Sequence, residues 1–333
     1  MRNDSRLRSG CIGSRWVPCY GTMSTARSTP NIALIKYWGN RNDQLRLCAN
    51  NNVAMTLNTP SVDVTVKQAD QFSVTSKNKE MTEKDIARFE KTYQLIKNYL
   101  AICNLQSAIP EFIAIKIDSA IPPAIGLASS AAVFSAFAKA VSGLIAEPRA
   151  GTPALVDKKN HISQSGSSAR GDGSSARGDG SSARGDGSSA HDGLTDEQIS
   201  VMARLGSGSA ARSIFGGYGA LKNLDGEGID SAIGYQVADE NHWKLHDIVI
   251  APNLTEKKVG STEGHASAWT SPDYRQRVED INGKRFDECV AAIQNKDFEK
   301  LQAVAEEDAM NMHHCMQTQN PPLMYLNDET LQN

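Results

Sequence analysis

A run of small residues after a proline pair is the strongest chemical signal in this sequence. The run begins at Pro122-Pro123 and continues as Ala124-Ile125-Gly126-Leu127-Ala128-Ser129-Ser130-Ala131-Ala132. A strand, a loop and a helix at this place would direct free backbone N–H groups and the positive end of a helix dipole at one point, which suits a polyphosphate. No G-x-x-x-x-G-K-[ST] pattern is present, so the loop is not the common P-loop. The run predicts a phosphate-binding turn, with plain helix packing as the alternative.

A second cluster of Gly and Ser lies between two arginines. It spans Arg204-Leu205-Gly206-Ser207-Gly208-Ser209-Ala210-Ala211-Arg212. Small residues flanked by arginine can bind an anion through backbone N–H groups and a bidentate guanidinium. The alternative is a flexible turn with solvated arginines. Lys257-Lys258 beside Ser261-Thr262 is a third candidate phosphate contact, against the alternative of a solvated lysine pair.

Other reactive residue types form weaker patterns. His242 and His246 have the spacing of metal ligands on a helix, but the sequence places no third ligand near them. His313-His314-Cys315 is interpreted in the same way. No G-x-S-x-G elbow is present, which argues against a serine hydrolase. We therefore predict no metal-ligating residues and no hydrolase chemistry.

Three Arg-Gly-Asp tripeptides occur inside a perfect tandem repeat. GSSARGD is repeated at 166–172, 173–179 and 180–186, and a partial copy covers 187–190. The repeat has no large apolar residue to form a coiled-coil seam, and Gly, Ser and charge do not offset the entropy of ordering. We expect residues 147–193 to form a flexible surface insertion. Because the tripeptide resembles the integrin-recognition sequence, an adhesive display protein is the alternative from a different functional class.

Composition limits the function classes. The chain has 333 residues, with 35 Lys plus Arg against 38 Asp plus Glu and a formal net charge of −3, so no basic excess favours nucleic acid. The most apolar stretch, residues 125–146, includes Lys139 and several serines and predicts a buried helix, not a membrane span. Six scattered cysteines without a C-x-x-C pair fit a reducing, cytoplasmic compartment. Residues 1–22 lack the apolar run of a secretory signal and are expected to be a disordered extension, with organelle targeting as the alternative.

Strands and helices alternate around these clusters. Strands are predicted at 32–38, where the residues are apolar, and at 62–66 and 112–117, where apolar and polar residues alternate. A further short strand is expected at 248–251. Helices are predicted from the three-and-four spacing of apolar residues or from a capping pattern, at 83–100, 130–145, from Thr195 onward, 274–294 and 297–312. The expected class is α/β or α+β, in one large or two medium domains.

Together the motifs resemble the diphosphomevalonate decarboxylases of the GHMP kinase superfamily. Five stretches match that family in its order: Pro30-Asn31-Ile32-Ala33-Leu34-Ile35-Lys36-Tyr37-Trp38-Gly39, Gly126-Leu127-Ala128-Ser129-Ser130-Ala131-Ala132, Gly206-Ser207-Gly208-Ser209-Ala210-Ala211-Arg212-Ser213, Ser261-Thr262-Glu263-Gly264 and Pro321-Pro322-Leu323-Met324-Tyr325-Leu326-Asn327-Asp328. The Lys-Tyr-Trp-Gly segment distinguishes this family from other GHMP kinases. The similarity extends from Arg27 to the end of the sequence, apart from the insertion.

The resemblance implies an α+β fold of the two-domain GHMP kinase type, with a two-layer α/β, ribosomal-protein-S5-like N-terminal half. The N-terminal ATP-binding domain would cover 23–220, interrupted by the insertion, and an incomplete C-terminal domain would cover 221–333. The active site would lie in the cleft between the halves. ATP and Mg²⁺ are the implied cofactors. Mevalonate 5-diphosphate would be phosphorylated on its tertiary 3-hydroxyl and then lose phosphate and CO2, giving isopentenyl diphosphate in the mevalonate pathway. Enzymes of this family are commonly homodimers, and no nucleic-acid or membrane partner is expected.

The same resemblance implies the site residues. ATP would be bound by Gly126, Leu127, Ala128, Ser129 and Ser130. The substrate would be bound by Lys36, Tyr37, Trp38, Gly39, Asn40, Ser207, Gly208, Ser209, Ala210, Ala211, Arg212, Lys258, Ser261 and Thr262. Arg212 is expected on the carboxylate side of the substrate and Ser209 near the transferring phosphoryl group. These two residues are the candidate catalytic residues.

Two departures from the family pattern bear on function. Asn40 stands where the family often has Lys, which removes a charge near the substrate's phosphates, although Arg41 follows. A phosphomevalonate decarboxylase acting on the 5-monophosphate and a GHMP small-molecule kinase therefore stay as alternatives. The family's catalytic Asp lies in an Asp-Ala-Gly-Pro-Asn motif downstream of the Leu-Asn-Asp match, and this sequence ends at Asn333 before that motif. We expect the 333-residue chain to bind nucleotide poorly and to turn over little.

Overall fold

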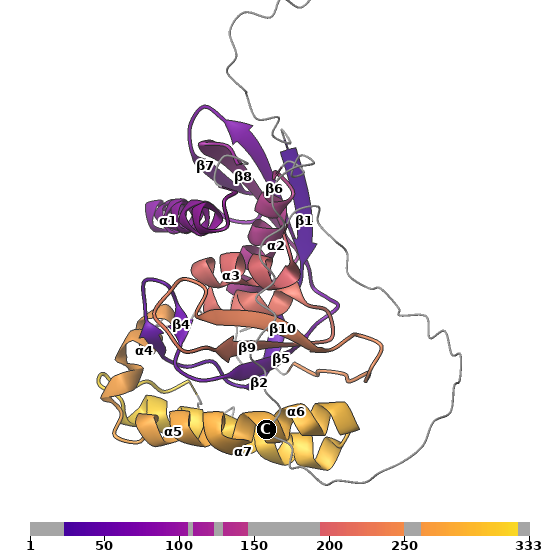
Figure 1. The fold of residues 1–333 in the computed structure, drawn as a ribbon, viewed down its shortest axis with the longest axis vertical. Coiled ribbons are helices and arrows are strands. Elements are labelled where there is room, and N and C mark those ends of the chain that lie inside the picture. Colours follow the sequence, from indigo (N-terminus) through magenta and orange to yellow (C-terminus); the bar gives the residue numbers. More distant parts are fainter. Residues whose placement is uncertain (1–22, 106–108, 123–128, 146–193, 250–260, 326–333) are drawn as a thin grey trace, which may run out of the picture.

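Strands and helices stack in four alternating layers (Figure 1). The computed structural model describes residues 23–105, 109–122, 129–145, 194–249 and 261–325. In the view of Figure 1 the layers are, from the top, a first sheet, a layer of helices, a second sheet and an outer layer of helices. The expected disordered extension, 1–22, and the expected insertion, 147–193, lie outside the described residues.

The first sheet is built from strands with alternating burial. Its order is β1 (Met23–Ser28), β6 (Val62–Ala69), β8 (Phe112–Ser119) and β7 (Ser73–Ser76), with antiparallel pairs except for β7 and β8. Val62, Val64 and Val66 are fully buried, because alternate side chains of a strand face the same side. They share one apolar core with helices α1 (Glu83–Ile102), α2 (Ser129–Ser142) and α3 (Asp196–Gly206).

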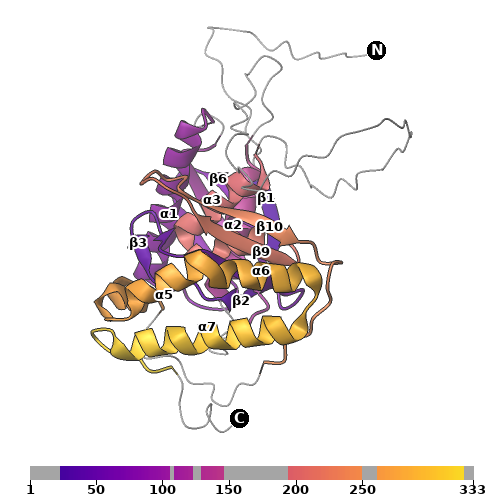
Figure 2. The same ribbon diagram turned by 60° about the horizontal axis from the view of Figure 1, so that its bottom comes forward.

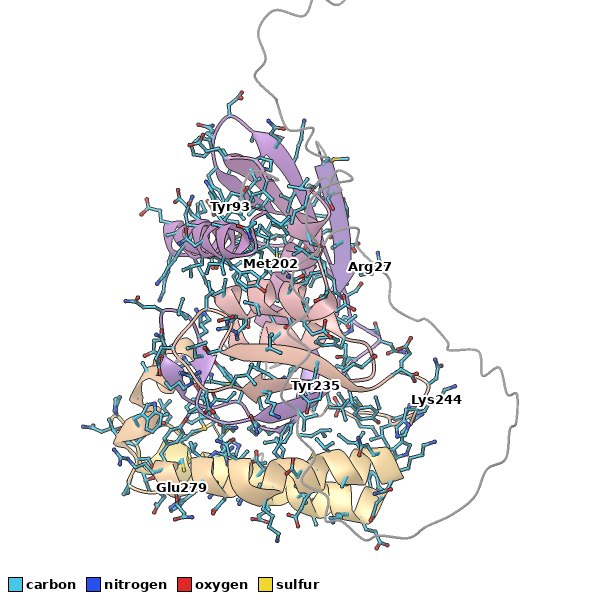
Figure 3. The ribbon with its side chains drawn as sticks, viewed as in Figure 1. Arg27, Tyr93, Met202, Tyr235, Lys244 and Glu279 are labelled. Atoms are coloured by element: carbon cyan, nitrogen blue, oxygen red, sulfur yellow. The ribbon has the colours of Figure 1, made fainter. Side chains whose placement is uncertain are left out.

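The middle helices begin where their sequences supply caps. Thr82 accepts a hydrogen bond from the Asp85 N–H at 3.1 Å, and the Asp85 carboxylate accepts from the Thr82 N–H at 3.2 Å, so α1 starts with a capping box. Thr195 and Gln198 form the same motif at the start of α3. Figure 3 shows Tyr93 of α1 and Met202 of α3 in this part of the molecule, and both side chains are fully buried.

The second sheet has four antiparallel strands. Its order is β10 (Ala232–Ala238), β9 (Tyr218–Asn223), β5 (Asn52–Thr56) and β2 (Asn31–Ile35). Two short strands, β3 (Asn40–Asn42) and β4 (Leu47–Cys48), pair beside it. A 3-10 helix, η2 (Gly208–Ile214), joins α3 to β9. The sheet thus combines strands that precede and follow 147–193, and the division into domains at 220 and 221 stays a prediction.

The outer layer contains the C-terminal helices. Its elements are α4 (Ser261–Ser267), η3 (Ala268–Thr270), α5 (Tyr274–Asp280), the π-helical turn η4 (Ile281–Arg285), α6 (Phe286–Asn295) and α7 (Phe298–Thr318). In Figure 2, α6 and α7 lie across the second sheet. Ile281, Phe286 and Ile293 form an apolar core with Ile35 and Val53 of that sheet.

Most of the predicted elements are confirmed. Helices 83–100 and 130–145 correspond to α1 and α2, and 297–312 to α7. The predicted helix 274–294 is observed as α5 and α6, joined by η4. The strand predicted at 32–38 ends at Ile35, because the next backbone groups bond to side chains instead of a neighbouring strand. The strand predicted at 248–251 is wrong over its described part, since Ile248 and Val249 have no regular structure and are 85% and 46% exposed.

Candidate active site

Serine hydroxyls join the start of α2 to the cluster that follows α3. The Ser130 and Ser207 hydroxyl oxygens are 3.3 Å apart, and those of Ser207 and Ser209 are 3.2 Å apart. Gly206 permits this approach, because a Cβ there would lie 2.1 Å from the ring of Phe134 on α2. The structure therefore brings together the end of the predicted nucleotide loop and the predicted substrate cluster.

Arg212 is held inside the site by two asparagines of the second sheet. Its side chain is 2% exposed, and it donates to Asn52 Oδ1 and, over 3.2 Å, to Asn31 Oδ1. Asn31 in turn donates to the Ser209 carbonyl at 2.9 Å. The Nε–H of Arg212 is buried and has no hydrogen-bond partner among the described residues. Burial lowers the pKa of Arg212 to about 10, so it stays a cation at neutral pH with a donor available to an anion.

Residues 36–40 have little regular structure, and side chains from the C-terminal part hold their backbone. Asp308 accepts from the Lys36 N–H at 2.7 Å, and His265 Nδ1 accepts from the Gly39 N–H at 2.8 Å. The Tyr274 hydroxyl donates to the Trp38 carbonyl at 2.6 Å, and Trp269 Nε1–H donates to the Asn40 carbonyl at 2.5 Å. These contacts satisfy backbone groups that a strand would otherwise satisfy.

Neighbouring residues restrict the aromatic side chains of Tyr37 and Trp38. The ring centroids of Tyr37 and Trp38 each lie 4.7 Å from that of His265. The Tyr37 hydroxyl donates to Asn40 Oδ1, and a Cβ on Gly208 would lie 2.3 Å from Tyr37 Cζ, so the ring lies directly against the start of η2. Burial raises the pKa of Tyr37, which keeps its hydroxyl protonated.

Arginines without acidic partners surround the serine cluster. Arg204 is fully buried and donates only to the carbonyls of Leu45, Ile229 and Ala232 among the described residues. Arg88 donates to the Gly206 carbonyl at 2.8 Å, and Arg46 donates to the Leu205 carbonyl at 3.2 Å. None of these three, nor Arg212, pairs with a carboxylate in the part of the chain that the structure describes. The site therefore has the uncompensated positive charge that an anionic ligand would neutralise.

Several predicted residues have other partners or lie outside the description. Lys36 Nζ donates to the Ala33 carbonyl at 2.8 Å, and burial lowers its pKa. The Asn40 amide donates to Asp43 at 2.8 Å. Ala210 and Ala211 are fully buried in η2, and Ser129 is exposed at the start of α2. Ser261 and Thr262 are placed by backbone only, at the start of α4. Gly126, Leu127, Ala128 and Lys258 lie outside the described residues.

Arg41 does not replace the charge that Asn40 lacks. Its guanidinium donates to Asn223 Oδ1 at 2.8 Å and to the carbonyls of Leu224 and Gly226, and it pairs with Glu227 at 3.0 Å. These contacts direct Arg41 to the turn between β9 and β10. Asn40 and Arg41 therefore contribute no cation to the serine cluster.

Sequence patterns did not indicate five residues that shape the site. Asn31 and Asn52 hold Arg212, Asp308 and His265 hold residues 36–39, and Arg46 adds positive charge. The available signals were slight: an Asp on the apolar side of a predicted helix, and a His directly after Ser-Thr-Glu-Gly. No predicted strand included Asn31 or Asn52. Each depends on a partner more than 100 residues away, which spacing along the chain does not reveal.

The histidine pairs have structural partners. His242 Nε2 lies 2.9 Å from the Ile293 carbonyl, and His314 Nε2 lies 2.9 Å from Asp273 Oδ2. The described ranges contain no group of three or more His, Cys, Asp or Glu arranged to bind a metal ion. They also contain no helix both long and apolar enough to cross a bilayer.

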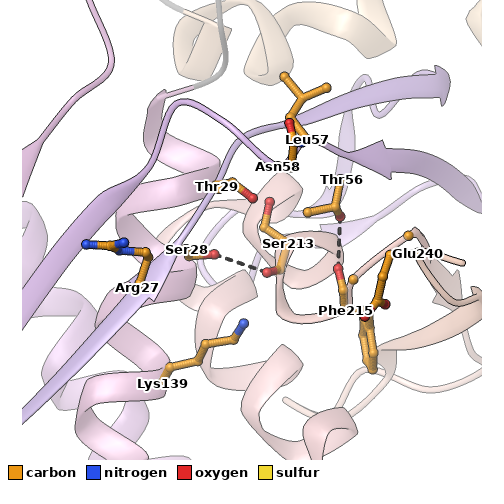
Figure 4. A pocket seen from close by; sticks show the side chains of 12 residues that line it. Arg27, Ser28, Thr29, Thr56, Leu57, Asn58, Lys139, Ser213, Phe215 and Glu240 are labelled. Carbon is orange, nitrogen blue, oxygen red and sulfur yellow. Dashed lines mark hydrogen bonds between the residues drawn. The ribbon is translucent and has the colours of Figure 1, made fainter. Parts of the chain in front are cut away.

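A separate cavity of about 270 Å³ lies near the site (Figure 4). Its lining includes Arg27, Ser28, Lys139, Ser213 and Glu240, but none of the predicted site residues. Ser213 is the connection, because its hydroxyl accepts from Asn31 Nδ2 at 2.7 Å. Burial lowers the pKa of Lys139.

Two protein-family models match this chain. A diphosphomevalonate decarboxylase-like N-terminal domain matches residues 28–177 and 151–232. A mevalonate 5-diphosphate decarboxylase C-terminal domain matches residues 248–332. The diphosphomevalonate decarboxylase of Aspergillus fumigatus is 27% identical over 323 residues, which cover 92% of this chain and 68% of the relative. That of Schizosaccharomyces pombe is 28% identical over 325 residues, which cover 91% and 69%.

Solved structures have the same fold. Mevalonate diphosphate decarboxylase from Staphylococcus aureus gives a TM-score of 0.68 at 25% identity, covering 93% of this chain and 79% of that chain. MDDEF in complex with MVAPP, AMPPCP and magnesium gives a TM-score of 0.67 at 24% identity, covering 93% and 80%. The expected two-domain fold of the GHMP superfamily agrees with these matches.

Proposed function

This chain belongs to the diphosphomevalonate decarboxylase family, and we propose that its arginine and serine site binds mevalonate 5-diphosphate beside ATP. The activity is ATP-dependent decarboxylation of that substrate to isopentenyl diphosphate, in the mevalonate pathway. ATP with Mg²⁺ supplies the phosphoryl group that turns the tertiary hydroxyl into a leaving group. The observation that best supports the proposal is the serine chain from Ser130 through Ser207 to Ser209, whose carbonyl shares Asn31 as a hydrogen-bond partner with Arg212.

Each described group has a role that follows from its chemistry. Arg212 has an unpartnered Nε–H and orients the substrate carboxylate. Ser209 lies between Arg212 and Ser207 and hydrogen-bonds the oxygen that receives the phosphoryl group. The surrounding arginines stabilise the negative charge of the reacting groups in a site where burial strengthens electrostatic interactions.

The site also protects the reacting carbon. Loss of phosphate leaves a carbocation-like centre, which a nearby nucleophile or water would capture. The described thiol near this region, that of Cys48, is fully buried, and burial raises its pKa to about 11, so it stays protonated. Tyr37 is likewise held in its neutral form. Both groups are therefore weak nucleophiles at neutral pH.

The alternatives are less well supported. The matches name diphosphomevalonate decarboxylases, which favours the diphosphate substrate over the 5-monophosphate, over a small-molecule kinase and over an adhesive display protein. Homodimer assembly remains our prediction, to be checked by light scattering. A cytoplasmic location also remains a prediction; the described cysteines, Cys48, Cys103, Cys289 and Cys315, are all buried free thiols, which supports it.

Arg212→Gln tests the assignment of the substrate site. The substitution is made in a protein that also carries the family's Asp-Ala-Gly-Pro-Asn segment. The glutamine amide cannot provide the charge, so we expect kcat/KM for mevalonate 5-diphosphate to fall by about 100-fold, in line with the cost of truncating a buried charge contact. Arg275→Gln is the matched control, because Arg275 is exposed on α5. An Arg212→Gln variant that folds and matches the control would refute the assignment.

A further inference from the structure

His265 differs from Tyr274 and Trp269, which also hold residues 36–40. The Tyr274 hydroxyl donates to the Trp38 carbonyl, and the indole N–H of Trp269 donates to the Asn40 carbonyl. Each of these side chains has a single polar atom, and that atom is already used. His265 has two ring nitrogens, and only Nδ1 is used, as the acceptor from Gly39.

The contact with Gly39 determines the protonation of the ring. A backbone N–H can only donate, so Nδ1 is unprotonated, and the neutral imidazole then has its proton on Nε2. The Tyr37 and Trp38 rings both pack against it, 4.7 Å away between centroids, and restrict rotation. Burial, with the charges of Arg46 and Arg212, lowers the pKa of His265 to about 3, so the neutral form persists at neutral pH.

The Nε2–H faces an environment that favours anions. It has no hydrogen-bond partner among the described residues, and the ring is only partly buried. Arg46 and Arg212 are close enough to act on the ring electrostatically, and neither pairs with a described carboxylate. Arg46 has a left-handed backbone, with φ of 50°, which is unfavourable for a long side chain. A neutral donor beside two cations suits an anionic oxygen.

We propose that His265 is a substrate-positioning residue: Nδ1 fixes the Tyr37-Trp38-Gly39 segment, and Nε2–H donates to an anionic oxygen of the substrate. The oxygen belongs to a phosphate or a carboxylate, which have the same acceptor chemistry here. The identity of the substrate rests on the proposed function. The donor role does not depend on it, because pyrophosphate and mevalonate can probe the two kinds of oxygen separately.

Three substitutions separate the two nitrogens. His265→Asn keeps an acceptor at the distance of Nδ1 from the backbone but removes the longer donor. His265→Gln places an amide N–H at the reach of Nε2 and removes the nearer acceptor. His265→Phe keeps an aromatic ring against Tyr37 and Trp38 and removes both nitrogens. The dissociation constants of pyrophosphate and mevalonate are measured by calorimetry, with Tm as the control for folding. The values of kcat and KM for mevalonate 5-diphosphate are measured in a protein that also carries the family's Asp-Ala-Gly-Pro-Asn segment.

We expect His265→Phe to raise the dissociation constant of one probe by about 10- to 100-fold, which is the effect of losing a hydrogen bond to a charged group. The weakened probe identifies the oxygen as phosphate or carboxylate. The probe affinities of His265→Asn and His265→Gln should lie between those of His265→Phe and the unaltered chain. In each variant, KM should be raised more than kcat is lowered.

Unchanged affinity for both probes in a folded Phe variant would overturn the proposal. The proposal would also be overturned if His265→Asn or His265→Gln bound both probes as tightly as the unaltered chain does. A third contrary result is an unaltered chain that binds neither probe. Failure of the proposed function is a separate result, namely absence of CO2 from mevalonate 5-diphosphate in a protein that also carries the family's Asp-Ala-Gly-Pro-Asn segment, while a probe still binds.

Discussion

Gly208 shows how closely the site is packed at the scale of single residues. An added Cβ would lie 2.3 Å from Tyr37 Cζ, and Tyr37 has little room to move because Asn40 and His265 hold it. We expect Gly208→Ala to displace Tyr37 and to raise KM by about 10-fold or more, since the loss of one oriented hydrogen bond costs about that much. The measurement is steady-state kinetics with mevalonate 5-diphosphate, in a protein that also carries the family's Asp-Ala-Gly-Pro-Asn segment.

Gly283 is the matched control for this substitution. Nothing lies within 4 Å of a Cβ added there, in the π-helical turn η4. Gly283→Ala should leave KM unchanged and stabilise the chain by about 0.5–1 kcal/mol through helix propensity. Equal kinetic effects of the two substitutions would show that the contact between Gly208 and Tyr37 is unimportant.

His265 also makes a predictable contribution to pH-dependent stability. Its pKa is about 3 in the folded chain and about 6.5 when unfolded, so the unfolded chain binds the proton more readily between these values. The stabilising contribution is complete above pH 6.5 and is lost as pH falls toward 3. Between pH 7.5 and 5.5, we expect the unaltered chain to lose about 1.4 kcal/mol more free energy of unfolding than His265→Phe. The free energies of unfolding are measured by urea titration at each pH. An equal change with pH in the two proteins would contradict this prediction.

The sequence predicted site residues that are clustered along the chain and missed those that are isolated in it. The serine cluster and Arg212 were predicted because small residues between arginines form a recognisable pattern. Asn31, Asn52 and His265 each act through a partner that only the fold brings near. Arg41 was considered as a substitute cation, but the turn between β9 and β10 binds it instead.

At the scale of elements, the buried carboxylate of Asp308 connects α7 both to α5 and to residues 36–40. Asp308 of α7 lies 3.0 Å from Arg277 Nη1 of α5, and both side chains are fully buried. The same carboxylate accepts from the Lys36 N–H at 2.7 Å. We expect Asp308→Asn to lower the free energy of unfolding by about 3–5 kcal/mol, because it leaves a buried arginine unpaired, and to raise KM through movement of Lys36.

An exposed ion pair provides the comparison. Arg27 and Asp63 are 2.7 Å apart, with side chains 69% and 36% exposed. Asp63→Asn should change the free energy of unfolding by less than about 1 kcal/mol, as exposed pairs usually do. Chemical denaturation of both variants gives the test, and similar losses would contradict the role assigned to Asp308.

Elements with strong periodicity were the predictable part of the fold. The helix at 83–100 and the strands at 62–66 and 112–117 follow directly from the spacing of apolar residues. The strand at 248–251 failed because four apolar residues without a partner strand do not determine a strand, and the described pair is exposed. The π-helical turn between α5 and α6 has no signal in the spacing of apolar residues.

At the scale of the whole molecule, the site depends on segments far apart in the chain. Residues 31–52, 204–212 and 265–308 contribute to one arrangement, in which the second sheet holds Arg212 and the outer helices hold residues 36–40. The order of motifs along the chain predicted the family and its two-domain fold. It did not predict which helices would hold residues 36–40, because that depends on packing between layers.

The most direct test of this account is release of CO2 and ADP from mevalonate 5-diphosphate with MgATP. It should be measured for a protein that carries this sequence together with the family's Asp-Ala-Gly-Pro-Asn segment, and for the Arg212→Gln variant of that protein. We predict CO2 and ADP in equal amounts from the unaltered protein, with kcat/KM about 100-fold lower in the variant. Absence of CO2 from the folded unaltered protein, or equal turnover by the two, would contradict the assignment of a decarboxylase site to Ser209 and Arg212.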